Sequence, residues 1–223
     1  MLDMCKELFL LRHGESEWNA AGRHQGQLES RLTQAGQAQA RAMGQVLVHA
    51  LKGRGLDPAA MPLRTSPLIR ARQTAEIALA PFGLRADPDD RLKEVHLGAW
   101  QALTDPEIFA RFPWAEAPRR NDPFMWNFMS PGGENLPMLS ARISALLDDL
   151  GEGPAILIAH GIALRVLRGL VLGLDAPGMR DLPGGQGVVW HIRGGVEAVL
   201  TTPEANAAAK ASAKNTRPGP TTA

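Results

Sequence analysis

The feature that most constrains the fold is an alternation of short apolar runs with longer segments of helical periodicity. Four apolar runs carry it, at residues 7–12, 62–65, 154–159 and 188–192. Their apolar or nearly apolar centres are typical of strands buried on both faces, as in a mostly parallel sheet. Because helical segments separate the strands, the alternation predicts an α/β fold, a three-layer αβα sandwich with helices on both faces of a mostly parallel central sheet.

Helical periodicity fills the gaps between these runs. It predicts helices over residues 34–51, 67–79, 136–150 and 162–172. Thr33 precedes the first helix as an N-cap, and Ser66 before Pro67 is typical of an N-cap followed by a first helical residue. Residues 91–133 have no regular pattern and are rich in Pro, Trp and Phe. We expect them to form a long insertion over the edge of the sheet, because excursions of this length are usually lids or binding loops.

The pattern predicts one domain, residues 1–200, followed by a tail, residues 201–223. The tail contains no Leu, Ile, Val, Phe, Met or Trp, so it has nothing to bury and we expect it to be disordered. It carries three basic residues and one acidic residue, so of the chain's net charge of +1 the domain holds −1. A balance this close to neutral argues against a general nucleic-acid or membrane-surface binder.

The remaining composition predicts an ordinary cytoplasmic protein. The single cysteine, Cys5, cannot form an internal disulfide. No apolar run approaches the roughly 18 residues of a membrane helix. Residues 1–11 hold an apolar stretch too short for a secretory signal, which needs about 7 to 15 apolar residues. We therefore expect a soluble protein without a membrane partner.

Two of the predicted strands end directly before a His-Gly pair, His13-Gly14 and His160-Gly161. In open parallel sheets, ligands bind in the crevice beyond the carboxyl ends of the strands, which is where both histidines would lie. The glycine after each histidine permits a tight turn and a close approach of backbone N–H groups to an anion. The arrangement predicts a ligand site at this edge of the sheet.

Two arginines are placed to join the histidines. Arg12 precedes the first histidine, and Arg70 lies one turn into the second predicted helix. A guanidinium group pairs bidentately with phosphate oxygens and keeps its charge. Two arginines and two histidines together predict a site of the size and charge of a phosphate group.

Four motifs occur in order along the chain. They are Arg-His-Gly-Glu-Ser-x-x-Asn at 12–19, Ser-Pro-Leu-x-Arg-Ala-x-Gln-Thr-Ala at 66–75, Leu-x-Glu-x-x-x-Gly-x-Trp at 92–100 and Ala-His-Gly at 159–161. With these motifs the chain resembles the histidine phosphatase superfamily, the phosphoglycerate mutase-like proteins. The resemblance covers most of residues 1–200 and leaves the tail outside.

The resemblance implies a phosphoryl transfer that needs no metal and no cofactor. In it, His13 attacks phosphorus and becomes a phosphohistidine. Arg12, Arg70 and His160 would stabilise the charge on the phosphoryl oxygens. Glu94 is implied as the proton donor to the leaving group, and then as the base that activates water.

Three further residues are implied as phosphate contacts, namely Asn19, Gln25 and Gly161. Because His160 is followed by glycine and not by aspartate, the chain resembles the mutase-like branch and not the acid phosphatases and phytases. This strengthens the assignment of Glu94 as the acid. Ser66 is expected to cap its helix, and His24 to be an ordinary surface or packed histidine.

Three functions stay open at the level of sequence. A phosphatase would hydrolyse a small-molecule phosphate ester. A phosphoglycerate mutase, primed by 2,3-bisphosphoglycerate, would return the phosphoryl group to bound glycerate, with Arg119 and Arg120 as cations for the substrate carboxylate. The segment 99–133 is short for a mutase, which favours the phosphatase. A non-catalytic phospho-ligand binder is the remote alternative, because His13 and Glu94 are both present.

We expect the segment 99–133 to contact the leaving group of the substrate and so to determine which esters are accepted. Its aromatic residues predict a partly hydrophobic roof over the site, formed by Phe109, Phe112, Trp114, Phe124, Trp126 and Phe128. The motifs are expected to contact only the phosphoryl group, so they do not identify the rest of the substrate. Dimers occur among the proteins that the chain resembles, and nothing in this sequence decides for a dimer.

Overall fold

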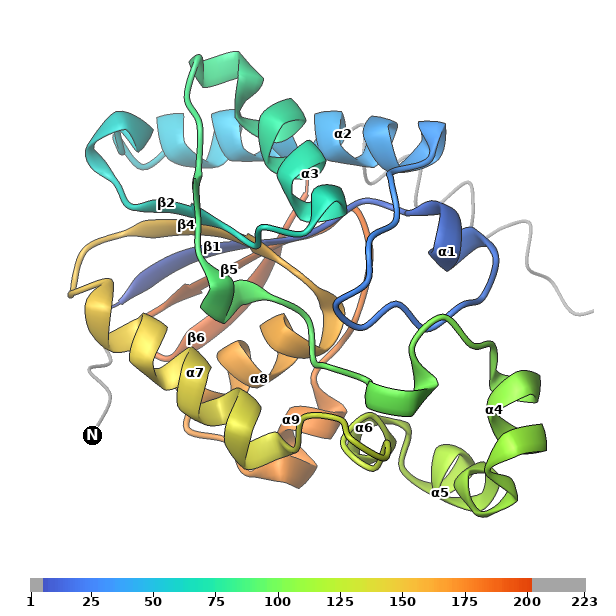
Figure 1. Ribbon diagram of the computed structural model, residues 1–223. Helices are drawn as coiled ribbons and strands as arrows, with labels where there is room; N and C mark the ends of the chain where they lie inside the picture. Colours follow the sequence, from blue (N-terminus) through green and yellow to red (C-terminus); the bar gives the residue numbers. More distant parts are fainter. Residues whose placement is uncertain (1–5, 202–223) are drawn as a thin grey trace, which may run out of the picture.

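The computed structural model describes residues 6–201, and its centre is a six-stranded sheet (Figure 1). The strand order is β3-β2-β4-β1-β5-β6. β3, β2, β4 and β1 are parallel, whereas β5 and β6 run antiparallel to their neighbours. The strands are β1 (Glu7–Arg12), β2 (Leu63–Thr65), β3 (Asp87–Pro88), β4 (Ala155–Ala159), β5 (Val189–Arg193) and β6 (Val196–Leu200).

Helices cover both faces of this sheet, which confirms the predicted three-layer fold (Figure 1). α2 (Gln34–Lys52) and α3 (Ile69–Leu79) pack on one face, and α7 (Leu136–Asp149) and α8 (Gly161–Val171) on the other. β1 contributes to both layers, because successive side chains of a strand point to opposite faces. Phe9 and Leu11 face α2 and α3, whereas Leu8 and Leu10 face α7 and α8.

The insertion is helical, where the sequence predicted an irregular segment. It contains α4 (Asp105–Arg111), α5 (Glu116–Asn121) and α6 (Pro123–Trp126), with short 3-10 turns at Asp90–Leu92, Gly98–Trp100 and Pro113–Ala115. Each helix is too short to show a period of its own, and capping side chains such as Thr104 and Asp122 define where they begin. The insertion lies at the carboxyl ends of the strands, beside α1 (Glu17–Ala20) and α9 (Ala176–Asp181).

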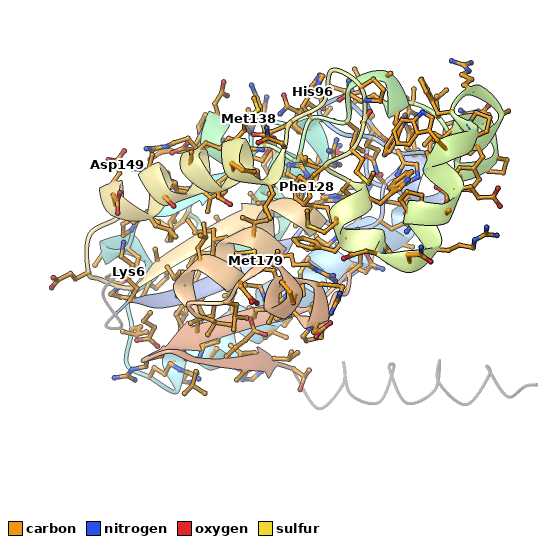
Figure 2. All side chains as sticks on the ribbon, turned by 90° about the horizontal axis from the view of Figure 1, so that it is seen from below. Lys6, His96, Phe128, Met138, Asp149 and Met179 are labelled. Carbon is orange, nitrogen blue, oxygen red and sulfur yellow. The ribbon has the colours of Figure 1, made fainter. Side chains whose placement is uncertain are left out.

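The insertion shares the core of the α7–α8 layer. Its buried tryptophans, Trp100 and Trp126, stack with their ring centroids 4.2 Å apart. Phe124 and Phe128 meet edge to face at 5.4 Å. Figure 2, which views the molecule from the α7–α8 side, shows the insertion at one end of this layer, with Phe128 at the junction.

Three details differ from the sequence prediction. Ser66 does not cap α3, which begins at Ile69 with Leu68 at the N-cap position. β3 and β6 were not predicted. β3 is two residues long and exposed, and β6 is mostly exposed, so neither has the buried apolar centre on which the prediction relied. Remaining 3-10 turns lie at Pro58–Ala60 and Ala80–Phe82.

No helix among residues 6–201 is long and apolar enough to cross a bilayer. Cys5 and the predicted tail, apart from Thr201, lie outside the described residues.

Candidate active site

The two histidines meet because β1 and β4 are parallel neighbours. Arg12 pairs with Ala159 in the register of the two strands, so the residues that follow them leave the sheet at the same edge. The His13 N–H donates to the Ala159 carbonyl at 3.0 Å. The imidazole rings of His13 and His160 lie 5.1 Å apart, centroid to centroid, at 59°.

A cavity of about 230 Å³ opens beside them. Seven of the eight predicted site residues line it, which are Arg12, His13, Asn19, Gln25, Arg70, Glu94 and Gly161. His160 is fully buried beside His13 and does not itself line the cavity. Gly161 lies close to Arg12, since a Cβ atom at this position would be 3.2 Å from the guanidinium carbon. The fold therefore gathers residues from all four motifs around one cavity.

His13 is held as a neutral imidazole with one nitrogen available for attack. Its Nδ1 lies 2.7 Å from the Gly14 carbonyl oxygen, which can only accept, so Nδ1 carries the proton and Nε2 the lone pair. Burial, followed by repulsion from Arg70 and Arg12, lowers the pKa of His13 well below 6.5. Near neutral pH the side chain is a nucleophile without first losing a proton.

His160 is oriented by a serine that the sequence assigned to a helix cap. Its Nε2 lies 2.7 Å from Ser66 Oγ, and that oxygen accepts a hydrogen bond from the Leu68 N–H at 3.3 Å. The Ser66 hydroxyl can then donate to His160 Nε2, which leaves Nδ1 as an N–H donor. Burial, together with repulsion from Arg70, His13 and Arg12, lowers the pKa of His160 well below 6.5.

Four buried nitrogens of the site have no hydrogen-bond partner within residues 6–201. They are Nδ1 of His160, the Nε atoms of Arg12 and Arg70, and the indole nitrogen of Trp190. Burying a polar group without a partner is costly, and native proteins rarely tolerate it without a functional reason. A bound anion with several acceptor oxygens would satisfy such donors.

Arg70 is positioned by the loop after α1. Its Nη1 donates to the Leu28 carbonyl at 2.8 Å and its Nη2 to the Gly26 carbonyl at 2.7 Å. Burial is the main cause that lowers the pKa of Arg70 to about 10, so it remains a cation at neutral pH. Burial also lowers the pKa of Arg12 from its usual value.

Asn19 and Gln25 point their amide oxygens into the protein. The Asn19 oxygen accepts from the Ser16 N–H at 3.1 Å and from Gln186 Nε2 at 3.0 Å. The Gln25 oxygen accepts from the Ser16 hydroxyl at 3.0 Å. The NH₂ ends of both amides are therefore the groups available as donors to an anion in the cavity.

Glu94 lies at the N-terminus of α8. Its carboxylate accepts hydrogen bonds from the backbone N–H groups of Val95 at 3.0 Å, Ala163 at 2.9 Å and Ile162 at 3.2 Å. These three hydrogen bonds hold the carboxylate in place at the start of the helix. In this arrangement Glu94 is placed to accept a proton, and it must be protonated before it can act as the implied proton donor.

The loop that carries Glu94 is held by an ion pair that the sequence analysis did not single out. Arg142 of α7 binds the Glu134 carboxylate through two nitrogens, at 2.7 and 2.8 Å. Arg142 also donates to the carbonyls of Arg91 at 2.6 Å, Lys93 at 2.8 Å and Glu94 at 3.1 Å. On the other side of Glu94, the His96 N–H donates to the Glu134 carboxylate at 3.3 Å. Arg142 thus fixes the loop on both sides of the catalytic candidate.

We expect Arg142→Ala to lower kcat by roughly 10- to 100-fold, because several charge-assisted hydrogen bonds to the Glu94 loop are lost. Affinity for inorganic phosphate should change less than 3-fold, since Arg12 and Arg70 are untouched. Steady-state kinetics and calorimetry with phosphate would separate the two effects. Arg91→Ala, which removes the ion pairs of Arg91 with Asp89 and Asp149 beside the same helix, is the matched control. Equal loss of kcat in both variants would contradict the positioning role.

The sequence analysis did not predict twelve of the residues that line the cavity, and five of these carry charged, imidazole or amide side chains: Arg23, His24, Asn127, Arg165 and Arg168. His24 is not an ordinary packed or surface histidine, because it lines the cavity and its Nε2 lies 2.6 Å from an Asp105 carboxylate oxygen. Arg165 and Arg168 appear in the sequence only as charges that interrupt an apolar helix. The available signal was an arginine in the middle of an otherwise apolar helical segment.

The predicted aromatic roof is wrong. None of its six residues lines the cavity. Five of them pack in the core of the α7–α8 layer, and Trp114 is half exposed and contacts Trp100 and Phe112. Trp126, for example, is buried and donates its indole N–H to the Ala115 carbonyl at 2.9 Å. Arg119 lies against Trp126 and Asp105 and lines a neighbouring pocket that shares Asn19, Arg23 and His24 with the cavity. Arg120 is exposed beside Glu116, so neither arginine lines the cavity itself.

The sequence profile of the histidine phosphatase superfamily (branch 1) matches residues 8–196. A relative from Photorhabdus laumondii named "Probable phosphoglycerate mutase GpmB" is 36% identical over 185 residues, which cover 79% of each chain. The glucosyl-3-phosphoglycerate phosphatase of Mycolicibacterium vanbaalenii is 32% identical over 196 residues, 83% of this chain and 82% of that one. A solved structure of a mycobacterial glucosyl-3-phosphoglycerate phosphatase complexed with VO3 has a TM-score of 0.71 at 31% identity, covering 87% of this chain and 97% of that chain.

Proposed function

Because this chain belongs to the histidine phosphatase superfamily (branch 1), we propose that it hydrolyses small phosphate monoesters through a phosphohistidine at His13, without a metal. The observation that carries the proposal is the neutral His13, with Nε2 unprotonated in a cavity that Arg12 and Arg70 also line. The buried, unpartnered nitrogens of Arg12, Arg70 and His160 support an anionic ligand at the same place.

In the first step, His13 Nε2 attacks phosphorus and the bond from phosphorus to the ester oxygen breaks. The leaving alkoxide takes a proton from Glu94. The Nδ1 proton of His13 stays on the ring, where the Gly14 carbonyl stabilises the positive charge that develops. Arg12, Arg70 and the Nδ1–H of His160 stabilise the charge on the equatorial phosphoryl oxygens.

In the second step, water attacks the phosphohistidine and Glu94 takes its proton. The P–N bond breaks, so the products are inorganic phosphate and a neutral His13. The three backbone N–H groups around the Glu94 carboxylate hold it in position for this step. The same group thus serves as acid and then as base, as microscopic reversibility requires.

Arg119 and Arg120, on which a mutase assignment relied, do not line the cavity. This favours hydrolysis over transfer to bound glycerate. To decide between them, the protein is incubated with 3-phosphoglycerate, EDTA and a trace of 2,3-bisphosphoglycerate, and phosphorus NMR follows the products beside a His13→Ala control. We expect inorganic phosphate only, absent in the control. Growth of 2-phosphoglycerate would make the protein a mutase.

The lowered pKa values of His13 and His160 predict a loss of stability in mild acid. Below pH 6.5 the unfolded chain binds protons at these histidines that the native state does not bind. The free energy of unfolding should therefore fall as pH decreases, by up to about 1.4 kcal/mol per pH unit for each histidine. Urea unfolding between pH 7.5 and 5.5 measures this slope. His13→Gln should have a shallower slope than the wild type, and an unchanged slope would contradict the buried neutral state.

A further inference from the structure

Arg165 is a cavity residue to which the proposed mechanism gives no task. It lies on α8 one turn after Gly161, and residues four apart on a helix share a face. Gly161 lies against Arg12, so Arg165 extends the same wall of the cavity. It is half-buried, and its Nη1 donates to the Arg180 carbonyl at 3.0 Å.

Two of the other cavity arginines are neutralised by carboxylates outside the cavity. Arg23 pairs with Glu107 at 2.9 Å. Arg168 binds Glu197 through two nitrogens, at 2.5 and 2.6 Å, and lies over the Trp190 ring. Arg165 has no carboxylate partner within residues 6–201. Of the five cavity arginines among the described residues, Arg12, Arg70 and Arg165 are therefore the three without an ion-paired carboxylate.

Glu94 is the only carboxylate among the described residues that line the cavity. When it carries the proton for the leaving group, three guanidinium groups face a phosphoryl group that carries two negative charges. One cation then lacks a counter-charge. Arg12 and Arg70 serve the phosphoryl group, so the unmatched cation is Arg165, one turn further along α8. Its environment disfavours the charge, since burial and the nearby Arg168 and Arg12 lower the pKa of Arg165. An anion beside it would relieve both costs.

We propose that Arg165 binds a second anionic group of the substrate, so that the preferred substrates are small phosphate monoesters with an added carboxylate or phosphate. The inference rests on the proposed function only in placing the phosphoryl group at His13, Arg12 and Arg70. Four residues of helix rise about 6 Å, which is compatible with an anionic group two or three carbons from the phosphate ester. The cavity of about 230 Å³ also favours such short molecules.

Three ligands with one three-carbon skeleton test the proposal. 3-Phosphoglycerate has a carboxylate at the far carbon, glycerol 1,3-bisphosphate has a phosphate there, and glycerol 3-phosphate has a neutral hydroxymethyl group. Their dissociation constants are measured by calorimetry in the full chain with His13→Ala, so that no ligand is consumed. The comparison adds Arg165→Gln, Arg165→Lys as a charge-retaining variant, and Arg120→Gln, a matched control on an exposed arginine.

We expect Arg165→Gln to weaken binding of 3-phosphoglycerate, glycerol 1,3-bisphosphate or both by roughly 10- to 100-fold, as loss of a charge-assisted hydrogen bond to the second anionic group predicts. Binding of glycerol 3-phosphate should change less than 3-fold, Arg165→Lys should recover part of the loss, and Arg120→Gln should match the parent. The ligand with the larger loss shows whether the second group is a carboxylate or a phosphate. Equal loss for all three ligands, no loss for any, or no binding of any ligand would overturn the proposal.

The same ligands given to the otherwise unmodified chain separate this inference from the proposed function. His13-dependent release of phosphate with no effect of Arg165→Gln on the preference between ligands would leave a phosphatase and remove the anion site. Arg165-dependent binding without any His13-dependent turnover would leave the anion site and remove the hydrolysis. Thermal unfolding and circular dichroism of Arg165→Gln establish that the variant is folded.

Discussion

Replacing His13 with alanine should abolish hydrolysis of every ester, with kcat lowered by roughly 10⁴- to 10⁶-fold. The nucleophile is lost, and the remaining cations can only bind the phosphoryl group. Phosphate affinity should fall far less, because Arg12 and Arg70 remain. Steady-state kinetics with several esters and calorimetry with phosphate give the two quantities.

Trapping the intermediate adds an independent test. Wild-type protein quenched during turnover and digested should yield a peptide with one added phosphoryl group on His13, readable by mass spectrometry. The exposed His49 provides a matched control, because His49→Ala removes an imidazole far from the motifs. His49→Ala should keep wild-type rates. A His13→Ala protein with wild-type turnover would refute the phosphohistidine mechanism.

Replacing Gly36 with alanine should destabilise the fold by about 3 kcal/mol or more, which is at the upper end of overpacking effects. A Cβ atom at Gly36 would lie 2.0 Å from the Glu15 carbonyl oxygen, and one at Gly14 would lie 2.2 Å from the Gly36 carbonyl oxygen. The two backbones therefore touch directly, and neither clash involves a flexible side chain. For a domain of this size, a loss of about 3 kcal/mol should lower the midpoint temperature of thermal unfolding by about 6 to 12 °C.

Gly153 offers the matched control for this substitution. A Cβ atom there meets nothing within 4 Å, so Gly153→Ala should change the free energy of unfolding by less than about 0.5 kcal/mol. Urea unfolding of the two variants beside the wild type gives the comparison. A Gly36→Ala protein as stable as Gly153→Ala would show that the loop shifts without cost. Phosphate binding would then report whether His13 shifts with it.

Much of the fold could be predicted from the sequence, because buried strands and amphipathic helices each produce a recognisable local pattern of apolar residues. β1, β2, β4 and β5 each have an apolar centre, and α2, α3, α7 and α8 begin or end within a few residues of their predicted bounds. The insertion was harder, because its helices are only four to seven residues long. At that length, capping side chains and not periodicity decide where a helix forms.

The site divides in the same way. The proximity of His13 and His160 could be predicted from the sequence, because both follow strands of a parallel sheet. The contact of His160 with Ser66 could not be predicted, since Ser66 is 94 residues away in the chain and resembles a helix cap. Gly14 was attributed to a tight turn and to room for an anion, whereas its missing side chain makes room for the backbone of α2 at Gly36.

The sequence by itself determined the layered α/β fold, the edge of the sheet at which the site lies, and the phosphate chemistry of its four motifs. These follow from periodicity and from the order of residues along a strand or a helical turn, which are short-range properties. The tertiary structure alone decided which arginines reach the cavity. Arg119 and Arg120 are directed to the insertion's own contacts, while Arg165 and Arg168 turn inward from an apolar helix. That choice depends on how segments distant in the chain pack and on which carboxylates they bring with them, and no local pattern encodes it.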